Sequence, residues 1–361
     1  MSRCLDIEPW AARPVVTFAN AFTGEHEESS TVSRILVTGG SGFIGTNVVE
    51  YYRTHGHEVI NVDIAKPRYA AHQAYWNNLD VTNGQALETL MFEFRPEYVF
   101  HMAARTDLEG DDVSQYRVNT LGVTNMLAAA TRNSPKRIVF ASSMLVCALG
   151  HRPREENDYS PPNTYGQSKV IAEKQIRNVP VNQLPWIIVR PTSIWGPWFG
   201  VPYRNFFDAV RRGYYIHPSS SLVRRTFGFV GNTVYQFDRL IRADSSRTLG
   251  RTFYLGDYEA AEIGFWADLI RKEFGSPPIK RVPLVLMRLS AVVGDVLKKC
   301  GLAKVPLTSA RLRNLLTEAV YDLEDLRIIC GDLPFDLEAG VRLTVAWLRD
   351  TEKARSEIGR M

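Results

Sequence analysis

Five short and almost unbroken apolar runs recur along the first half of the chain. They are rich in Val, Ile and Phe and span residues 34–39, 57–63, 97–104, 137–143 and 185–191. Runs of this length without polar alternation are typical of strands that are buried on both faces. Between them the apolar residues recur with a helical period, as in residues 43–56 and 121–133. Alternating strands and helices predict a doubly wound, parallel α/β sheet with right-handed crossovers.

The alternation of strand and helix patterns ends after about Pro191, where prolines become frequent and helical patterns dominate. We therefore expect an α/β domain over residues 34–192 and a smaller, mostly helical region over residues 193–361, interleaved with the first. Residues 1–33 fit neither pattern and are interpreted as an N-terminal extension. They contain no apolar stretch of signal-peptide length, which favours a cytoplasmic protein.

Composition and charge narrow the classes of function. The 361 residues are 45% hydrophobic and 23% charged, as in an ordinary globular protein. The net charge of +4 is small and the basic pairs stand apart, so nucleic acid is not an expected partner. Four separated cysteines without a CxxC motif predict free thiols, and neither a disulfide framework nor a metal site is expected. They are Cys4, Cys147, Cys300 and Cys330.

One later stretch, residues 282–297, is strongly apolar. It is interrupted by Arg288 and Asp295 and is shorter than the roughly 20 residues that a membrane span requires. The pattern predicts an amphipathic helix and no membrane span. Contact with a membrane interface is a minor alternative.

A glycine-rich segment follows the first expected strand. Gly39, Gly42 and Gly45 are spaced GxxGxxG, which lets the backbone turn tightly and leaves a helix N-terminus facing a diphosphate. Asp63 ends the second strand, where a carboxylate accepts hydrogen bonds from ribose hydroxyls and repels a 2′-phosphate. The segment therefore predicts NAD rather than NADP as cofactor. A glycine-rich turn without a ligand is the alternative.

A candidate catalytic pair lies further along the chain. Tyr165 and Lys169 are four residues apart, so on a helix they share one face. An ammonium group beside a phenol favours the phenolate and lowers a pKa that is otherwise near 10, which makes the tyrosine a usable base. An exposed surface pair is the alternative. The pair follows the strand-end serines Ser142 and Ser143 by about twenty residues.

Five segments together carry a family resemblance: "TGGSGFIG", "HMAA", "FASS", "YGQSK" and "RPTSIWGP". In this order they resemble the extended short-chain dehydrogenase/reductase family, the group of NAD-dependent nucleotide-sugar epimerases and dehydratases. The resemblance spans roughly residues 34–350 and implies a Rossmann-type NAD-binding domain. It also implies a homodimer formed through the helix of Tyr165 and its neighbour.

The same resemblance implies roles for single residues. Ser143 bonds the substrate oxygen, Tyr165 removes its proton, and Lys169 bonds the nicotinamide ribose. The implied cofactor-binding residues are Gly39, Gly42, Phe43, Ile44, Gly45, Asp63, Asp80, Val81, Met102, Ala103, Ala104, Asn119, Tyr165, Lys169 and Pro191. A turn or helix cap is the alternative for Asp80. We interpret His101 as a packed strand-end residue and Ser142 as a partner of local backbone groups.

The segment "VRRTFGFV" resembles the family's "RDFxxV", which places Arg225 on the position of a diphosphate-binding arginine. A solvent-facing Arg225 is the alternative. The candidate substrate-binding residues are Thr106, Ser143, Ser193 and Arg225. The segment "RPTSIWGP" also resembles hydroxysteroid- and dihydroflavonol-type relatives, in which Trp195 and Trp198 would line an apolar pocket or act as packing anchors.

Met144 and Leu145 follow Ser143 where dehydratases of the family carry an acid–base Asp-Glu pair. Neither side chain carries a proton, so elimination is disfavoured, whereas epimerisation at C4 requires neither group. We therefore expect an NAD-dependent epimerase of a nucleotide-diphosphate sugar. The alternatives are an NAD-dependent dehydrogenase of a hydrophobic alcohol and a catalytically silent NAD-binding sensor or scaffold.

Overall fold

The computed structural model describes residues 31–358 except 152, 220–221, 303–304 and 306. Most of the predicted N-terminal extension, with Cys4, lies outside the described residues. In the described part Cys147, Cys300 and Cys330 are free thiols.

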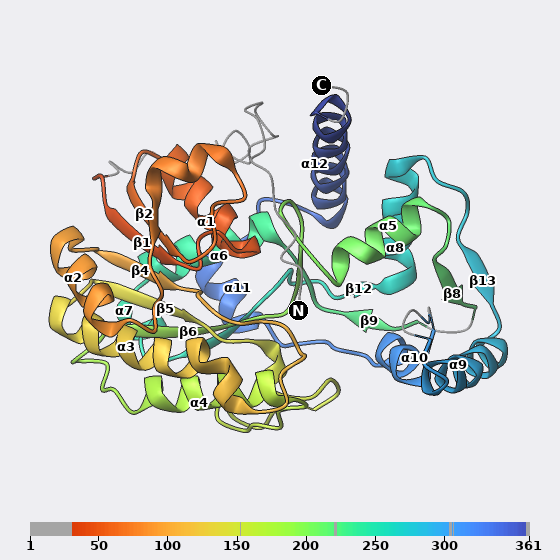
Figure 1. Cartoon of the computed structure of the whole chain (residues 1–361), viewed down its shortest axis with the longest axis horizontal. Coiled ribbons are helices and arrows are strands. Elements are labelled where there is room, and N and C mark those ends of the chain that lie inside the picture. Colours follow the sequence, from red (N-terminus) through yellow and green to blue (C-terminus); the bar gives the residue numbers. More distant parts are fainter. Residues whose placement is uncertain (1–30, 152, 220–221, 303–304, 306, 359–361) are drawn as a thin grey trace.

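A seven-stranded parallel sheet forms the centre of the larger domain, with the strand order β11-β6-β5-β4-β1-β2-β3 (Figure 1). Its strands are β1 (Arg34–Thr38), β2 (Glu58–Asp63), β3 (Trp76–Asn78), β4 (Tyr98–His101), β5 (Arg137–Ala141), β6 (Trp186–Pro191) and β11 (Thr252–Leu255). The five apolar runs supply five of these strands, and the predicted doubly wound α/β fold is confirmed. The other two strands, β3 and β11, lie outside those runs, and β11 comes from beyond residue 192.

Helices cover both faces of this sheet. One layer consists of α2 (Gly84–Phe94), α3 (Arg117–Asn133) and α4 (Thr164–Arg177). The other consists of α1 (Phe43–Thr54), α6 (Val230–Arg242) and α11 (Glu324–Cys330). The short α7 (Ser245–Thr248) leads into β11. Since two helices of the second layer follow residue 192, the larger domain is completed by late segments of the chain.

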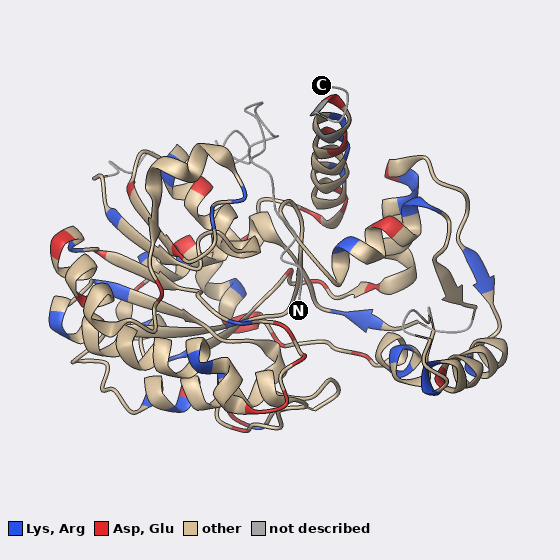
Figure 2. Ribbon diagram, viewed as in Figure 1, with Lys and Arg blue, Asp and Glu red and all other residues tan. Residues whose placement is uncertain are grey.

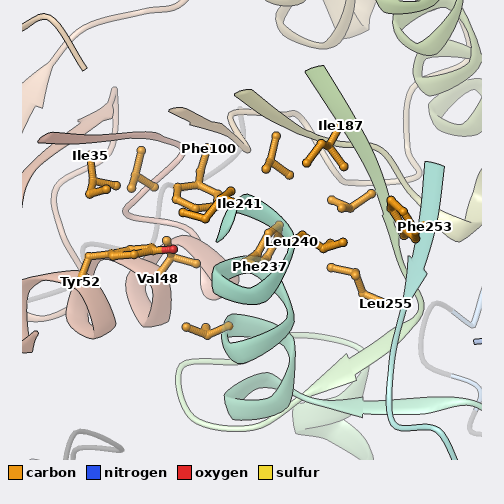
Figure 3. Close-up of a cluster of buried hydrophobic side chains, with 14 of the residues drawn as sticks. Ile35, Val48, Tyr52, Phe100, Ile187, Phe237, Leu240, Ile241, Phe253 and Leu255 are labelled. Atoms are coloured by element: carbon orange, nitrogen blue, oxygen red, sulfur yellow. The ribbon is translucent and has the colours of Figure 1, made fainter. Parts of the chain in front are cut away.

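The apolar layer beneath α1 and α6 shows how strand alternation builds the core (Figure 3). Ile35 of β1 faces this layer, while the next residue, Leu36, faces the opposite one. Tyr52 stacks on Phe100 with ring centroids 5.3 Å apart, and Phe237 meets the same Phe100 ring edge-on at 5.6 Å. These contacts fix α1 and α6 against the strands.

The second region lies to one side of the sheet (Figure 1). Its elements are β7 (Ser193–Trp195), α5 (Tyr203–Arg211), β8 (Ile216–Pro218), β9 (Arg224–Arg225), β10 (Phe227–Phe229), β12 (Ala261–Glu262), α8 (Ile263–Phe274), β13 (Lys280–Val282), α9 (Leu284–Lys299), α10 (Ser309–Leu316) and α12 (Leu337–Ile358). A core of aromatic residues holds it together, with Trp195 against Phe229 and Trp266. The predicted helix over residues 282–297 is α9. No helix among the described residues has the length and apolar character that crossing a bilayer requires.

Candidate active site

A cavity of about 950 Å³ opens at the carboxyl ends of the parallel strands. It lies where the strand order reverses between β1 and β4, the point at which open α/β sheets bind ligands. Its volume is at the upper end of the roughly 300–1,000 Å³ of small-molecule sites. Most of the predicted site residues line it, namely Gly39, Gly42, Phe43, Ile44, Gly45, Asp63, Asp80, Val81, Met102, Ala103, Ala104, Thr106, Ser143, Tyr165, Lys169 and Pro191. Asn119, Ser193 and Arg225 are not among the lining residues.

The glycine loop between β1 and α1 fits a diphosphate. Gly39 has a φ of 71°, and a Cβ atom there would lie 2.7 Å from the backbone nitrogen of Ala103. At Gly45 a Cβ atom would lie 2.1 Å from the carbonyl oxygen of Gly39. Gly42 caps α1 without any side-chain hydrogen bond, so the first amides of that helix remain available to an anion.

Asp63 lies at the end of β2 beside this loop. Its carboxylate accepts hydrogen bonds from the backbone N–H of Ser41 at 3.0 Å and of Ala65 at 2.9 Å. Burial raises the pKa of Asp63 above its ordinary value, and these amides oppose the shift. The carboxylate is thus fixed at the edge of the cavity, where the sequence pattern predicts contact with a ribose of the cofactor.

Arg68, which no sequence pattern predicted, also lines the cavity. Its guanidinium donates to the carbonyl oxygen of Ser41 at 3.0 Å and to that of Trp198 at 2.7 Å. It therefore joins the glycine loop to the second region. No local sequence signal identifies it, because its partners are 27 and 130 residues away.

Ser143 and Tyr165 meet within the cavity. The hydroxyl of Ser143 accepts from the backbone N–H of Leu145 at 3.1 Å and is hydrogen-bonded to the Tyr165 phenol. Burial raises the pKa of Tyr165, and the bond to Ser143 opposes that shift. The predicted lowering of this pKa by a neighbouring ammonium is therefore wrong for this arrangement.

The position of Lys169 explains the difference. Its ammonium group donates to the carbonyl oxygen of Ala141 at 2.8 Å, at the end of β5. Burial lowers the pKa of Lys169 to about 8, with the charge of Glu173 acting in the opposite direction. Lys169 shares a helix face with Tyr165 and therefore lies in the same cavity. Its ammonium group, however, bonds the end of β5 rather than the Tyr165 phenol.

Glu173 lies beneath these residues in a buried polar network. Its carboxylate accepts from Ser142 at 2.5 Å, from Tyr159 at 2.9 Å and from Arg190 at 2.8 and 2.9 Å. The network joins α4 to the ends of β5 and β6. Ser142 therefore bonds a side chain rather than the local backbone, contrary to our interpretation. The spacing of Glu173, four residues after Lys169 on the same helix, could have identified it.

His101 and Asn119 have structural positions. The Nδ1 atom of His101 lies 2.9 Å from the Thr38 hydroxyl, and burial lowers its pKa to about 3, so the ring is neutral and packed as predicted. Asn119 donates to the carbonyl oxygen of Arg105 at 3.0 Å and to the Ser168 hydroxyl at 2.9 Å. It thereby joins the chain after β4 to α4.

The remaining candidate substrate residues lie outside the cavity wall. Ser193 is buried and hydrogen-bonded to Tyr203, which lines the cavity and was not predicted. Arg225 donates to the carbonyl oxygens of Asn314 and Thr317 at the end of α10, and its Nε atom is buried without a partner. The guanidinium is therefore held by α10, and its role toward a substrate stays a prediction.

The two tryptophans considered for an apolar pocket do not line the cavity. Trp195 is in the core of the second region, and Trp198 packs against Trp347 with ring centroids 5.7 Å apart. Both are packing anchors, which was the second of the two interpretations.

Similarity to known proteins agrees with this geometry. The chain is 26% identical over 321 residues to an N-acetyl-alpha-D-glucosaminyl-diphospho-ditrans,octacis-undecaprenol 4-epimerase of Escherichia coli O157:H7, covering 87% of this chain and 94% of that protein. It is 28% identical over 256 residues to a 3-beta-hydroxysteroid dehydrogenase of Mycolicibacterium neoaurum, covering 65% and 69%.

The fold is shared with UDP-glucose 4-epimerase of Thermotoga maritima, solved with UDP-glucose. The TM-score is 0.68 at 20% identity, with 88% of this chain and 99% of that one covered. The model of the NAD dependent epimerase/dehydratase family matches residues 35–256, which is more than half of the chain. This match confirms the predicted family and its cofactor, and the chain therefore belongs to the NAD-dependent epimerase/dehydratase family of enzymes.

Proposed function

We propose that this chain is a nucleotide-sugar 4-epimerase, which oxidises the C4 hydroxyl of a sugar and reduces the resulting ketone from its other face. The observation that carries the proposal is the convergence of Ser143, Tyr165 and Lys169 on one cavity with the glycine loop and Asp63. A dinucleotide site and a proton-transfer site thus share one space.

Each residue of the centre has a distinct role in this proposal. Ser143 holds the reacting oxygen, and Tyr165 exchanges the proton of that oxygen through its phenol. NAD, when bound, supplies the hydride acceptor. Lys169, fixed by the Ala141 carbonyl at 2.8 Å, holds a positive charge beside the reacting groups. Because the pKa of Tyr165 is raised, its phenol carries a proton at neutral pH, which suits the reduction half of the cycle.

Met144 and Leu145 favour epimerisation over elimination. They follow Ser143 in a single helical turn, Met144–Val146, whose N-terminal cap is Ser143. Elimination of water requires an acid and a base close to Ser143, and neither of these side chains titrates. Reversible oxidation requires, besides NAD as the hydride acceptor, only the proton exchanged by Tyr165.

The substrate class is supported by the relatives. The E. coli relative, which matches 87% of this chain, is a 4-epimerase whose named substrate is an amino sugar linked through a diphosphate to undecaprenol, whereas the T. maritima structure holds UDP-glucose. The diphosphate link is common to both names, so we propose a sugar linked to a diphosphate, with a nucleotide as the carrier as in UDP-glucose. Arg225 is the candidate for contact with that diphosphate if α10 releases it.

A dehydrogenase of a hydrophobic alcohol is the second candidate. It is favoured by the similarity to the 3-beta-hydroxysteroid dehydrogenase and by the position of Arg225 outside the cavity wall. The two candidate functions differ in the net amount of NADH that they form. A dehydrogenase forms one NADH for each alcohol oxidised, whereas an epimerase forms none overall.

The test is incubation of the purified chain with UDP-glucose, UDP-N-acetylglucosamine and their C4 epimers, followed by NMR of the anomeric protons and absorbance at 340 nm. We expect interconversion of one pair without net NADH. Tyr165→Phe should lower kcat about 10²- to 10⁴-fold, the usual contribution of a general acid–base group.

Tyr116→Phe is the matched control. Its ring lies 6.2 Å from that of Tyr165, and its hydroxyl donates to the Asp107 carbonyl outside the cavity wall. Its kcat should stay near the wild-type value. Net NADH formation with a sterol alcohol would favour the second candidate. Full activity of Tyr165→Phe would refute the mechanism, and NAD binding without any turnover would favour a silent NAD-binding protein.

A further inference from the structure

The outward face of α9 is apolar and exposed. Seven aliphatic residues form it, each between 40% and 65% exposed: Val285, Leu286, Leu289, Val292, Val293, Val296 and Leu297. Leu302, just after the helix, is 50% exposed. Single exposed aliphatic residues are ordinary on protein surfaces, but a contiguous group of this kind marks an interaction site.

The opposite face of α9 is fully engaged. Met287 and Ala291 pack against Leu312 of α10 in a small apolar core. Gly294 faces the same side, and a Cβ atom there would lie 1.9 Å from the carbonyl oxygen of Leu307. This close approach fixes the rotation of the helix. With 3.6 residues per turn, the outward face points directly away from this contact, so repacking against α10 cannot bury it.

Basic residues surround the outward face. The exposed ones are Lys280, Arg281, Arg288, Lys298 and Lys299, of which Arg281 pairs with Asp268 at 3.4 Å. Asp295 is turned toward α10, where it accepts from the backbone N–H of Ser309 at 3.1 Å. Residues 280–313 contain eight basic residues and this single acidic one. The border of the apolar face therefore carries an excess of positive charge, and the blue β13 shows part of it (Figure 2).

The helix lies at the outer end of the second region. Figure 1 places α9 at the lower right of the view, below β8 and β13, with α10 between it and the larger domain. A flat surface can therefore approach α9 without meeting the larger domain.

We propose that α9 binds the surface of an anionic lipid bilayer, with its axis in the plane of the interface. Its outward face would enter the boundary between headgroups and acyl chains, while the surrounding Lys and Arg residues contact anionic headgroups. A bilayer fits better than a second copy of this chain. Face-to-face pairing of two α9 helices would bring their basic borders together and cost repulsion.

The test is sedimentation of the full chain with extruded vesicles, either of phosphatidylcholine alone or with about one third phosphatidylglycerol. Binding to the anionic vesicles should be strong and should weaken as salt rises. The double variant Leu289→Glu, Val293→Glu should bind at least about a hundredfold more weakly. The double variant Lys298→Gln, Lys299→Gln should lose about 25-fold, at roughly fivefold for each basic residue near a charged membrane.

Phe92→Glu is the matched control, because Phe92 is 63% exposed on α2, in the larger domain. It should bind vesicles like the wild type, and NAD binding by every variant confirms folding. The proposal is overturned if the wild type does not sediment with anionic vesicles, or if Phe92→Glu loses as much binding as the α9 variant. It is also overturned if the α9 variant changes only a monomer–dimer equilibrium in sedimentation velocity.

Discussion

Replacing Glu173 by alanine tests the buried network beneath the catalytic centre. Arg190 is 1% exposed, and Glu173 is the acidic partner of its guanidinium at 2.8 Å. Removing the carboxylate leaves an uncompensated buried charge, which costs about 3–5 kcal/mol. Ser142 and Tyr159 also lose their acceptor. We therefore expect Glu173→Ala to lower the free energy of unfolding by about 4 kcal/mol.

The assay is urea denaturation followed by tryptophan fluorescence and circular dichroism. Glu156→Ala is the matched control, since Glu156 pairs with Arg177 at 3.1 Å where both side chains are partly exposed. Such a pair contributes about 1 kcal/mol or less. A loss for Glu173→Ala no larger than that of the control would refute the reasoning.

A second variant separates charge from packing. Glu173→Leu combined with Arg190→Met removes both charges and keeps apolar volume, so it should be more stable than Glu173→Ala alone. If the double variant is the less stable of the two, the buried charge is not the source of the loss.

Three further changes test the cavity. Between pH 8 and 10.5 the unfolded chain binds more protons than the folded one, because the pKa of Lys169 falls from 10.5 to about 8 on burial. The free energy of unfolding of the wild type should therefore rise across this range relative to that of Lys169→Met, by up to about 3 kcal/mol. Parallel plots of this free energy against pH would contradict the lowered pKa of Lys169. In titration calorimetry, Asp63→Ala should reduce the preference for NAD over NADP by about 10- to 100-fold, because it removes a hydrogen bond to a charged group. An unchanged ratio of the two affinities would contradict the assignment of NAD to this site. Gly45→Ala should abolish tight NAD binding, because its Cβ atom would lie 2.1 Å from the Gly39 carbonyl oxygen. A wild-type affinity for NAD would show that binding does not require this close approach within the loop.

Local patterns predicted five of the strands in the first half of the fold. The strands β1, β2, β4, β5 and β6 are buried on both faces, so their apolar runs are continuous and easy to recognise. The strand β11 was not predicted because its place in the sheet is fixed by pairing with β6, from Thr252–Ile188 to Leu255–Pro191. That pairing is a long-range contact, which hydrophobic periodicity does not reveal.

In the candidate site, too, the residues placed by local spacing were predicted and those placed by long-range contacts were not. Residues held by short spacing, such as Gly39, Gly45, Tyr165 and Lys169, all line the cavity. Arg68 and Tyr203 were missed because their place in the cavity depends on contacts distant in sequence. The pKa of Tyr165 was also misjudged, since helix spacing fixes the position of the Lys169 side chain but not the atom to which its ammonium group bonds.

The late arrival of β11, α6 and α11 sets an order for folding during synthesis. A nascent chain that ends near residue 192 presents β6 as an open sheet edge, and the apolar face that α6 later covers is exposed to water. That face cannot close until residues 230–255 have left the ribosome, and α11 follows about seventy residues later. Chaperone contact is therefore most needed in this interval, and a cut between the two regions would leave the first with an unfinished core.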